Sequence, residues 1–147
     1  MSRVALLDVN VLVALFDPDH VHHEAAHAWF APSRSAGWAT CPLTENGVVR
    51  VLSNPAYGAE PERPGALLAR LRTFCASGGH VFWPDDVTLL GARTLREGAA
   101  LSHATLTDVY LLALAVAHGG RLATFDRRIP VSAVTGVEKG HLELIPA

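Results

Sequence analysis

The sequence predicts a three-layer α/β/α fold, in which helices cover both faces of a central, mainly parallel sheet of four to five strands. Three observations predict this class. Short apolar strand patterns alternate with helical patterns along the chain. The first strand pattern leads directly into a helix, with no turn that would reverse the chain. The length of 147 residues, half of them apolar, suits one domain over residues 1–147 with a single buried core.

In the first half of the chain, apolar runs mark the strands, and capping or breaking residues bound the helices. Asp17-Pro18-Asp19 ends the first helix, Thr44 is placed to cap the third, and Ser53-Asn54-Pro55 breaks it. Residues 32–37 form a loop. The expected elements are a strand at residues 3–9, a helix at 10–16, a helix from 19 or 20 to about 30, a strand at 38–41 and a helix at about 45–52.

The second half begins with an exposed connection at residues 54–65, which holds three prolines and two glycines. In the next helix Leu67 and Leu71 share one face. Thr107 is placed to cap the last helix, and Gly119-Gly120 closes it. The expected elements are helices at about 66–76, 87–97 and 107–118, strands at 80–83 and 121–125, and a possible fifth strand at 142–145.

The net charge of −2, with His neutral, excludes a surface that is basic overall but leaves room for a local basic patch. Cys41 and Cys75 form no C-x-x-C motif, and no secretory leader precedes them, which favours buried thiols in a reducing compartment. The longest apolar run, residues 109–117, is too short to span a bilayer. We therefore expect a soluble cytoplasmic protein without membrane contact.

Four acidic residues stand at the ends of predicted elements. Asp8 and Asp126 each end an apolar strand, whereas Glu45 and Asp108 fall in the first turns of helices. Taken singly, the two helical acids could merely favour the helix dipole, an effect of ~0.3–1 kcal/mol. The two strand-end acids could be ordinary turn residues. In a parallel α/β fold, however, strand ends and helix starts share one edge of the sheet, so all four can converge on one pocket.

Converging carboxylates repel one another and would hold protons unless a cation neutralised them. Ligands that are all oxygen, with no Cys, indicate Mg²⁺ or Mn²⁺, which keep water ligands and act on phosphates. Such a site can activate water and stabilise the leaving oxygen in phosphodiester hydrolysis.

Four segments carry these acids: "LLDVNVLVAL", "LTENGVVRVLSNP", "LTDVYLLALA" and "RLATFDRR". Their order resembles that of the acidic motifs of PIN-domain nucleases, and the length and layout of the chain resemble the VapC toxins of bacterial toxin–antitoxin pairs. The resemblance covers nearly the whole chain. It implies a PIN-like fold and an Mg²⁺-dependent endoribonuclease in which Mn²⁺ can replace Mg²⁺. It also implies an RNA substrate, a homodimer and a small VapB-type antitoxin that occupies the active-site groove.

The resemblance also assigns roles to residues. Asp8, Glu45, Asp108 and Asp126 would be the catalytic, metal-binding quartet, with Asp8 and Asp108 as the most direct ligands. Two polar residues match positions that often support the site, Asn10 and Thr124.

Substrate contact requires cations near the pocket. The candidates for binding the RNA backbone are Arg50, Arg121, Arg127 and Arg128. The planar fork of Arg suits phosphate recognition. Equally, these residues could form a solvated face or pair within the chain.

Another motif points to a different chemistry. His23-Glu24-Ala25-Ala26-His27 spells H-E-x-x-H, and its two histidines lie on one face of a helix, as the ligands of a zinc protease do. The extended metalloprotease pattern, however, requires a glycine where this chain has Phe30 and a third histidine where it has Ser33. A structural helix, with Trp29 and Phe30 packed inward, is the preferred interpretation.

Two further alternatives stay open. Asp8 could be the phosphorylated nucleophile of a phosphatase, but the second Asp of that pattern is missing, and the single lysine, Lys139, lies in a Gly-flanked loop. The chain could also be a PIN-like module that binds RNA without cutting it.

Overall fold

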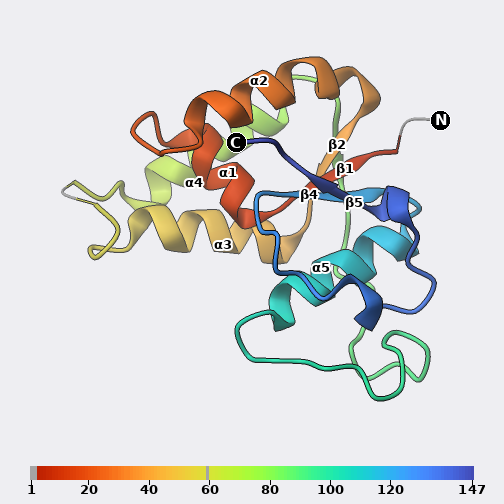
Figure 1. Cartoon of the computed structure of the whole chain (residues 1–147). Helices are drawn as coiled ribbons and strands as arrows, with labels where there is room; N and C mark the ends of the chain where they lie inside the picture. The colour runs from red at the N-terminus through yellow and green to blue at the C-terminus, as the bar shows by residue number, and fades with distance from the viewer. Residues whose placement is uncertain (1–2, 59) are drawn as a thin grey trace.

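The computed structural model describes residues 3–58 and 60–147. A five-stranded sheet forms its centre, with the strand order β3-β2-β1-β4-β5 and every neighbouring pair parallel (Figure 1). The strands are β1 (Ala5–Leu7), β2 (Trp38–Thr40), β3 (His80–Phe82), β4 (Arg121–Thr124) and β5 (Leu142–Leu144). The predicted parallel sheet of four to five strands is confirmed.

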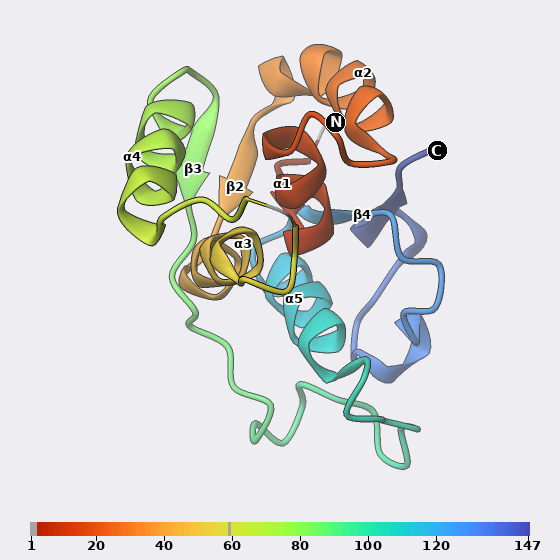
Figure 2. The same cartoon turned by 90° about the vertical axis from the view of Figure 1, so that its left-hand side faces the viewer.

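Within the described residues, five α-helices pack against this sheet. They are α1 (Val9–Phe16), α2 (His23–Ser33), α3 (Pro42–Ser53), α4 (Pro64–Cys75) and α5 (Leu106–Ala117). The buried side chains of α1 to α4 form one hydrophobic core, whereas those of α5 form a second core on the other face of the sheet. Successive strand residues alternate between the two cores, as Leu6 and Leu7 do. Figure 2 shows α1 to α4 grouped together and α5 below them. The three-layer α/β/α architecture is therefore confirmed.

The helix predicted at residues 87–97 is wrong, because that segment consists of turns and irregular backbone. Its backbone is bound to a distant segment: Arg96 N–H donates to the Ala133 carbonyl at 2.8 Å, and Thr94 accepts from Thr135 N–H at 3.1 Å. Leu90, which a helix would have to bury, is 94% exposed. These tertiary hydrogen bonds replace the intrahelical ones, and an open loop from residue 83 to 105 leads to α5 (Figure 2).

Several helix boundaries also differ from the prediction. α3 begins at Pro42, so Thr44 lies inside its first turn, where its Oγ1 accepts from the backbone N–H of Cys41 at 3.0 Å. α5 begins at Leu106 after Thr105, so Thr107 does not cap it. α2 continues past Phe30 to Ser33, through part of the expected loop.

The H-E-x-x-H motif lies at the start of α2, against the carboxyl end of α1. The last four carbonyls of a helix have no partner within the helix. Here the Ala14 carbonyl lies 2.7 Å from His23 Nδ1, and the Leu15 carbonyl 3.0 Å from His27 Nε2. The other two carbonyls accept from Asp17 N–H and Arg70 Nη2. Since a carbonyl only accepts, these two histidine nitrogens must donate, and the motif therefore caps the carboxyl end of α1.

No helix in residues 3–58 and 60–147 is long and apolar enough to cross a membrane.

Candidate active site

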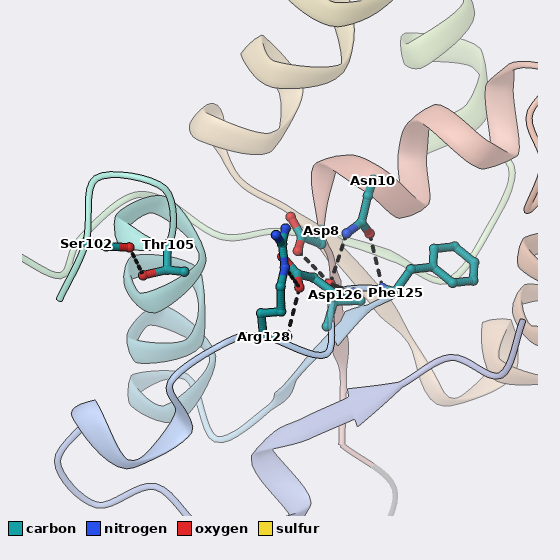
Figure 3. Close-up of polar contacts among 8 residues, drawn as sticks. Asp8, Asn10, Ser102, Thr105, Phe125, Asp126 and Arg128 are labelled. Atoms are coloured by element: carbon teal, nitrogen blue, oxygen red, sulfur yellow. Dashed lines mark hydrogen bonds and ion pairs between the residues drawn. The ribbon is translucent and has the colours of Figure 1, made fainter. Parts of the chain in front are cut away.

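Three of the predicted acids meet at the carboxyl edge of the sheet. β1 and β4 are neighbours with Leu7 paired to Ala123, so Asp8, which follows β1, lies beside Thr124, the last residue of β4. Asp126 follows two residues later, and Asp108 lies in the first turn of α5. Figure 3 shows Asp8 and Asp126 pointing toward the same space. This placement follows from the parallel topology, which brings strand ends to one edge.

Asp8 is buried, with 3% of its surface exposed, and is the N-cap of α1. Its Oδ1 accepts from the Val9 backbone N–H at 2.7 Å, and its Oδ2 accepts from Thr124 Oγ1 at 2.8 Å. Burial raises the pKa of Asp8, and these two hydrogen bonds oppose the rise. Its carboxylate is thus fixed on both oxygens and kept from bulk water.

Thr124 and Asn10 form the network that holds the strand ends together, and Figure 3 shows Asn10 beside Asp8 and Phe125. Thr124 Oγ1 donates to Asp8 and accepts from Asn10 Nδ2 at 3.1 Å and from the Asp126 backbone N–H at 3.0 Å. A hydroxyl has one proton and two lone pairs, so this oxygen is fully used. Asn10 Oδ1 also accepts from the Phe125 backbone N–H at 3.3 Å. The two residues therefore fix Asp8 relative to the turn that carries Asp126.

Asp126 is paired with Arg128, two residues further on. Its Oδ1 accepts from the Arg128 backbone N–H at 2.8 Å and from the guanidinium Nε at 3.2 Å. These interactions, the backbone one first, lower the pKa of Asp126. The Arg128 side chain is otherwise exposed to solvent.

The pKa of Asp108 depends on the charges of the other two acids. Its pKa is raised to about 6, first by burial and then by the negative charges of Asp8 and Asp126, while Arg128 opposes the rise. The three carboxylates are therefore electrostatically coupled, which is the condition that a bound cation relieves. An all-oxygen set of this kind fits Mg²⁺ or Mn²⁺. As the side chains stand, no group of three His, Cys, Asp or Glu in the described part of the chain is gathered closely enough to hold an ion.

Glu45 is hydrogen-bonded at the end of the neighbouring strand β2. It lies in the first turn of α3, as predicted, but its Oε2 accepts from Thr40 Oγ1 at 2.7 Å. Thr40 Oγ1 in turn lies 2.8 Å from His80 Nε2. The charge of Glu45 adds to burial in raising the pKa of Cys75, on α4. The structure thus couples three of the four predicted acids electrostatically and binds the fourth, Glu45, to Thr40 at the carboxyl end of β2.

Sequence reasoning missed Thr40 and His80. Thr40 is the last residue of β2, five positions before Glu45, and a hydroxyl near the end of a predicted apolar strand was the available signal. His80 begins β3 and carried no such signal, because only the pairing of β2 with β3 brings it to Thr40.

The predicted RNA-binding arginines are spread over the molecule. Arg127 and Arg128 are exposed and directly follow Asp126, and Arg50 is exposed in the last turn of α3. Arg121 begins β4, so it lies at the opposite edge of the sheet from the acids. Its Nε is 2.5 Å from Glu143 Oε1, and its Nη1 donates to the Arg3 carbonyl at 2.6 Å. Two of the four arginines therefore directly adjoin the acids.

Comparison with known proteins identifies the family of the chain. The family model described as "PIN domain" matches residues 5–134. The chain is 47% identical to ribonuclease VapC39 of Mycobacterium tuberculosis over 133 residues, which cover 90% of this chain and 96% of that protein. It is 46% identical to ribonuclease VapC44 of the same organism over 138 residues, covering 94% and 96%. The chain therefore belongs to the PIN-domain family and, within it, to the VapC ribonucleases.

Proposed function

We propose that this protein is an Mg²⁺-dependent endoribonuclease toxin, which hydrolyses RNA phosphodiester bonds and is inhibited by a cognate VapB-type antitoxin. The observation that carries the proposal is the coupled group of Asp8, Asp108 and Asp126 at the carboxyl edge of the sheet. The names of the relatives, ribonucleases VapC39 and VapC44, support the reaction class.

In this proposal, Asp8, Asp108 and Asp126 hold Mg²⁺ together with Glu45, and Mn²⁺ can replace it. When bound, the ion would lower the pKa of a water and offset the negative charge of the phosphodiester. Thr124 and Asn10 keep the Asp8 carboxylate in place by the hydrogen bonds described above. The burial of Asp8 limits competition from bulk water for its oxygens. The site thus starts with its ligands largely oriented, which lowers the cost of binding the ion.

In this proposal, the arginines beside the acids bind the RNA. Arg127 and Arg128 can bind backbone phosphates on either side of the bond to be cut, and Arg50 can extend this contact along α3. Such contacts read no sequence, so they fix the register of the RNA without choosing the target.

The proposed enzyme is a single PIN domain that extends over residues 1–147. β5 lies outside the matched residues 5–134 but pairs with β4 in the same sheet, which supports this extent. We further propose that the protein acts in the cytoplasm as a homodimer, where RNA and the antitoxin are both available.

The decisive experiment is cleavage of end-labelled single-stranded RNA with Mg²⁺, with Mn²⁺ and with EDTA. Asp8→Asn and Asp108→Asn should each lower cleavage by about 100-fold or more, beyond the ~10–100-fold typical of a change outside the metal ligands. Asp19→Asn, at an exposed acid outside the site, serves as the matched control.

Two outcomes would redirect the proposal. RNA that binds but stays intact with either ion would identify a binding module without cleavage. Products that end in a 2′,3′-cyclic phosphate would show that the 2′-hydroxyl, not water, attacks. Expression of the chain alone should arrest growth, Asp8→Asn should relieve the arrest, and co-expression of the antitoxin should do the same.

A further inference from the structure

A second polar cluster lies between β2, β3 and the start of α3. Thr40 is its centre: its side chain is fully buried, and its Oγ1 is 2.7 Å from Glu45 Oε2 and 2.8 Å from His80 Nε2. The Cys75 thiol on α4 also lies beside Thr40 and Glu45. The cluster therefore connects an acid of the proposed active site to an edge strand of the sheet.

The chemistry of the three groups fixes the direction of these hydrogen bonds. An ionised carboxylate only accepts, so Thr40 must give its single proton to Glu45. Thr40 Oγ1 can then only accept from His80, which requires His80 to carry its proton on Nε2. Burial, opposed by the charge of Glu45, lowers the pKa of His80 and so favours a neutral imidazole, whose single proton must then be on Nε2. The result is a directed chain from His80 through Thr40 to Glu45.

Each donor in this chain is held by the fold. The His80 ring packs on Trp38 with the ring centroids 4.7 Å apart, and the two residues are paired in register between β2 and β3. Thr40 is fixed by its place in the ladder between β1 and β3. Glu45, by contrast, has several rotatable bonds, and the Thr40 hydroxyl is its protein partner at Oε2. Without that bond the carboxylate would be free to sample many positions.

We propose that Thr40 and His80 are positioning residues that hold the Glu45 carboxylate for catalysis. By engaging Oε2, they leave Oε1 as the oxygen that can face a cation or a water. Neither residue needs to touch RNA or the ion. This inference rests on the proposed nuclease function.

The first test is steady-state kinetics of RNA cleavage. Thr40→Val keeps the shape of the side chain and removes the donor, and we expect kcat to fall about 10–100-fold, as for other outer partners of catalytic ligands, with KM for RNA nearly unchanged. Thr40→Ser restores the hydroxyl and should restore most of kcat. His80→Phe keeps a ring on Trp38 but loses Nε2–H, and should have a smaller effect of the same kind.

Thr73→Val is the matched control. Thr73 lies on the exposed surface of α4, and its hydroxyl donates to the Ala69 carbonyl within the same helix. This variant should cleave RNA like the wild type. If Thr40→Val also cleaves like the wild type, the positioning role is overturned.

The second test needs neither RNA nor metal. ¹⁵N chemical shifts of the histidine rings should show His80 as the Nε2–H tautomer in the wild type, with its signals assigned by their loss in His80→Phe. The tautomers should mix in Thr40→Val. A wild-type His80 protonated on Nδ1 would overturn the chain even if Thr40→Val failed to fold. A wild type that cleaves no RNA would instead overturn the proposed function, and the tautomer would still decide the hydrogen-bond chain.

Discussion

At the residue scale, the negative charge of Asp108 works against folding when no cation is present. Folding raises its pKa from the ordinary value of 3.8 to about 6. A carboxyl with a raised pKa contributes stability below the unfolded value and loses it as the pH rises through the folded value. The ionisation of Asp108 should therefore lower the free energy of unfolding of the metal-free protein as the pH rises from about 4 to about 6.

Asp108→Asn should therefore stabilise the metal-free protein at pH 7.5. Because the side chain is partly exposed, the gain should be about 1 kcal/mol, less than the full shift would give, or about 2–4 °C in Tm. Thermal unfolding in EDTA at pH 7.5 and pH 4.5 measures it, and the difference should shrink at the lower pH. A variant that melts below the wild type at pH 7.5 would contradict the assigned environment.

Arg128 should compete with a metal ion, whereas Arg127 should not. Arg128 is paired with Asp126, but its side chain is exposed. Arg128→Ala should therefore tighten Mn²⁺ binding only slightly, since fully exposed ion pairs are weak. Arg127→Ala should leave Mn²⁺ binding unchanged.

Both arginine variants, Arg127→Ala and Arg128→Ala, should weaken RNA binding and reduce its salt dependence. Calorimetric titration with Mn²⁺ and RNA binding at several salt concentrations check this, and equal effects on Mn²⁺ would refute the distinction.

Sequence reasoning could place the acids along the chain but could not orient every side chain. Asp8 and Asp126 are fixed by strand ends, and strand ends of a parallel sheet meet by topology. Glu45 is on a helix, where the first turn places its Cα but leaves its side-chain torsions to the surroundings. Those surroundings include His80, which comes from a strand 35 positions later in the sequence and is paired only through the fold.

At the element scale, the close contact of α1 with α3 sets the distance between Asp8, which directly precedes α1, and Glu45, which lies in α3. A Cβ added at Gly47 would lie 2.5 Å from Val9 Cγ2, so a larger residue would require the Val9 side chain or one of the two helices to shift. Val9 directly follows Asp8, and Gly47 lies two residues after Glu45. The glycine therefore permits both acids to be carried by helices in contact.

Gly47→Ala should destabilise the protein by about 1–3 kcal/mol, the usual cost of overpacking. Gly65→Ala is the control, because a Cβ at Gly65 in α4 meets open space and should be neutral or stabilise by up to ~1 kcal/mol. Urea denaturation measures both. The double variant Gly47→Ala with Val9→Ala should recover part of the loss, and a Gly47→Ala protein as stable as the wild type would show that the helices can separate freely.

The packing of α2 against the end of α1 explains why the H-E-x-x-H motif is a misleading sign of a zinc protease. Its spacing does place His23 and His27 on one face of a helix, and their rings pack with centroids 4.5 Å apart. That face meets the end of α1, whose carbonyls need donors. The sequence shows the spacing but not the partner, which depends on how α1 and α2 pack. The missing helix at residues 87–97 has the same cause, since its backbone partners lie near residues 133–135.

At the scale of the whole molecule, the all-parallel sheet is what assembles the site. β1, β4 and the two helices α1 and α5 each deliver a carboxylate or its support to one edge, and the two hydrophobic cores on either face hold these elements in place. The alternation of strands and helices predicted this sheet from the sequence alone. The strand order depends on long-range packing, which local patterns do not encode.

A divalent cation should therefore stabilise the entire fold, because it binds an edge that exists only when all these elements are assembled. At about 100 times its dissociation constant, Mn²⁺ should add ~2.7 kcal/mol, or roughly 5–10 °C in Tm. Asp8→Asn should abolish the rise, and Asp19→Asn should keep it. The rise should also weaken as the pH falls through about 6, because the ion must then displace a proton from Asp108. Identical melting curves in EDTA and in millimolar Mn²⁺ at pH 7.5 would show that the coupled carboxylates hold no ion.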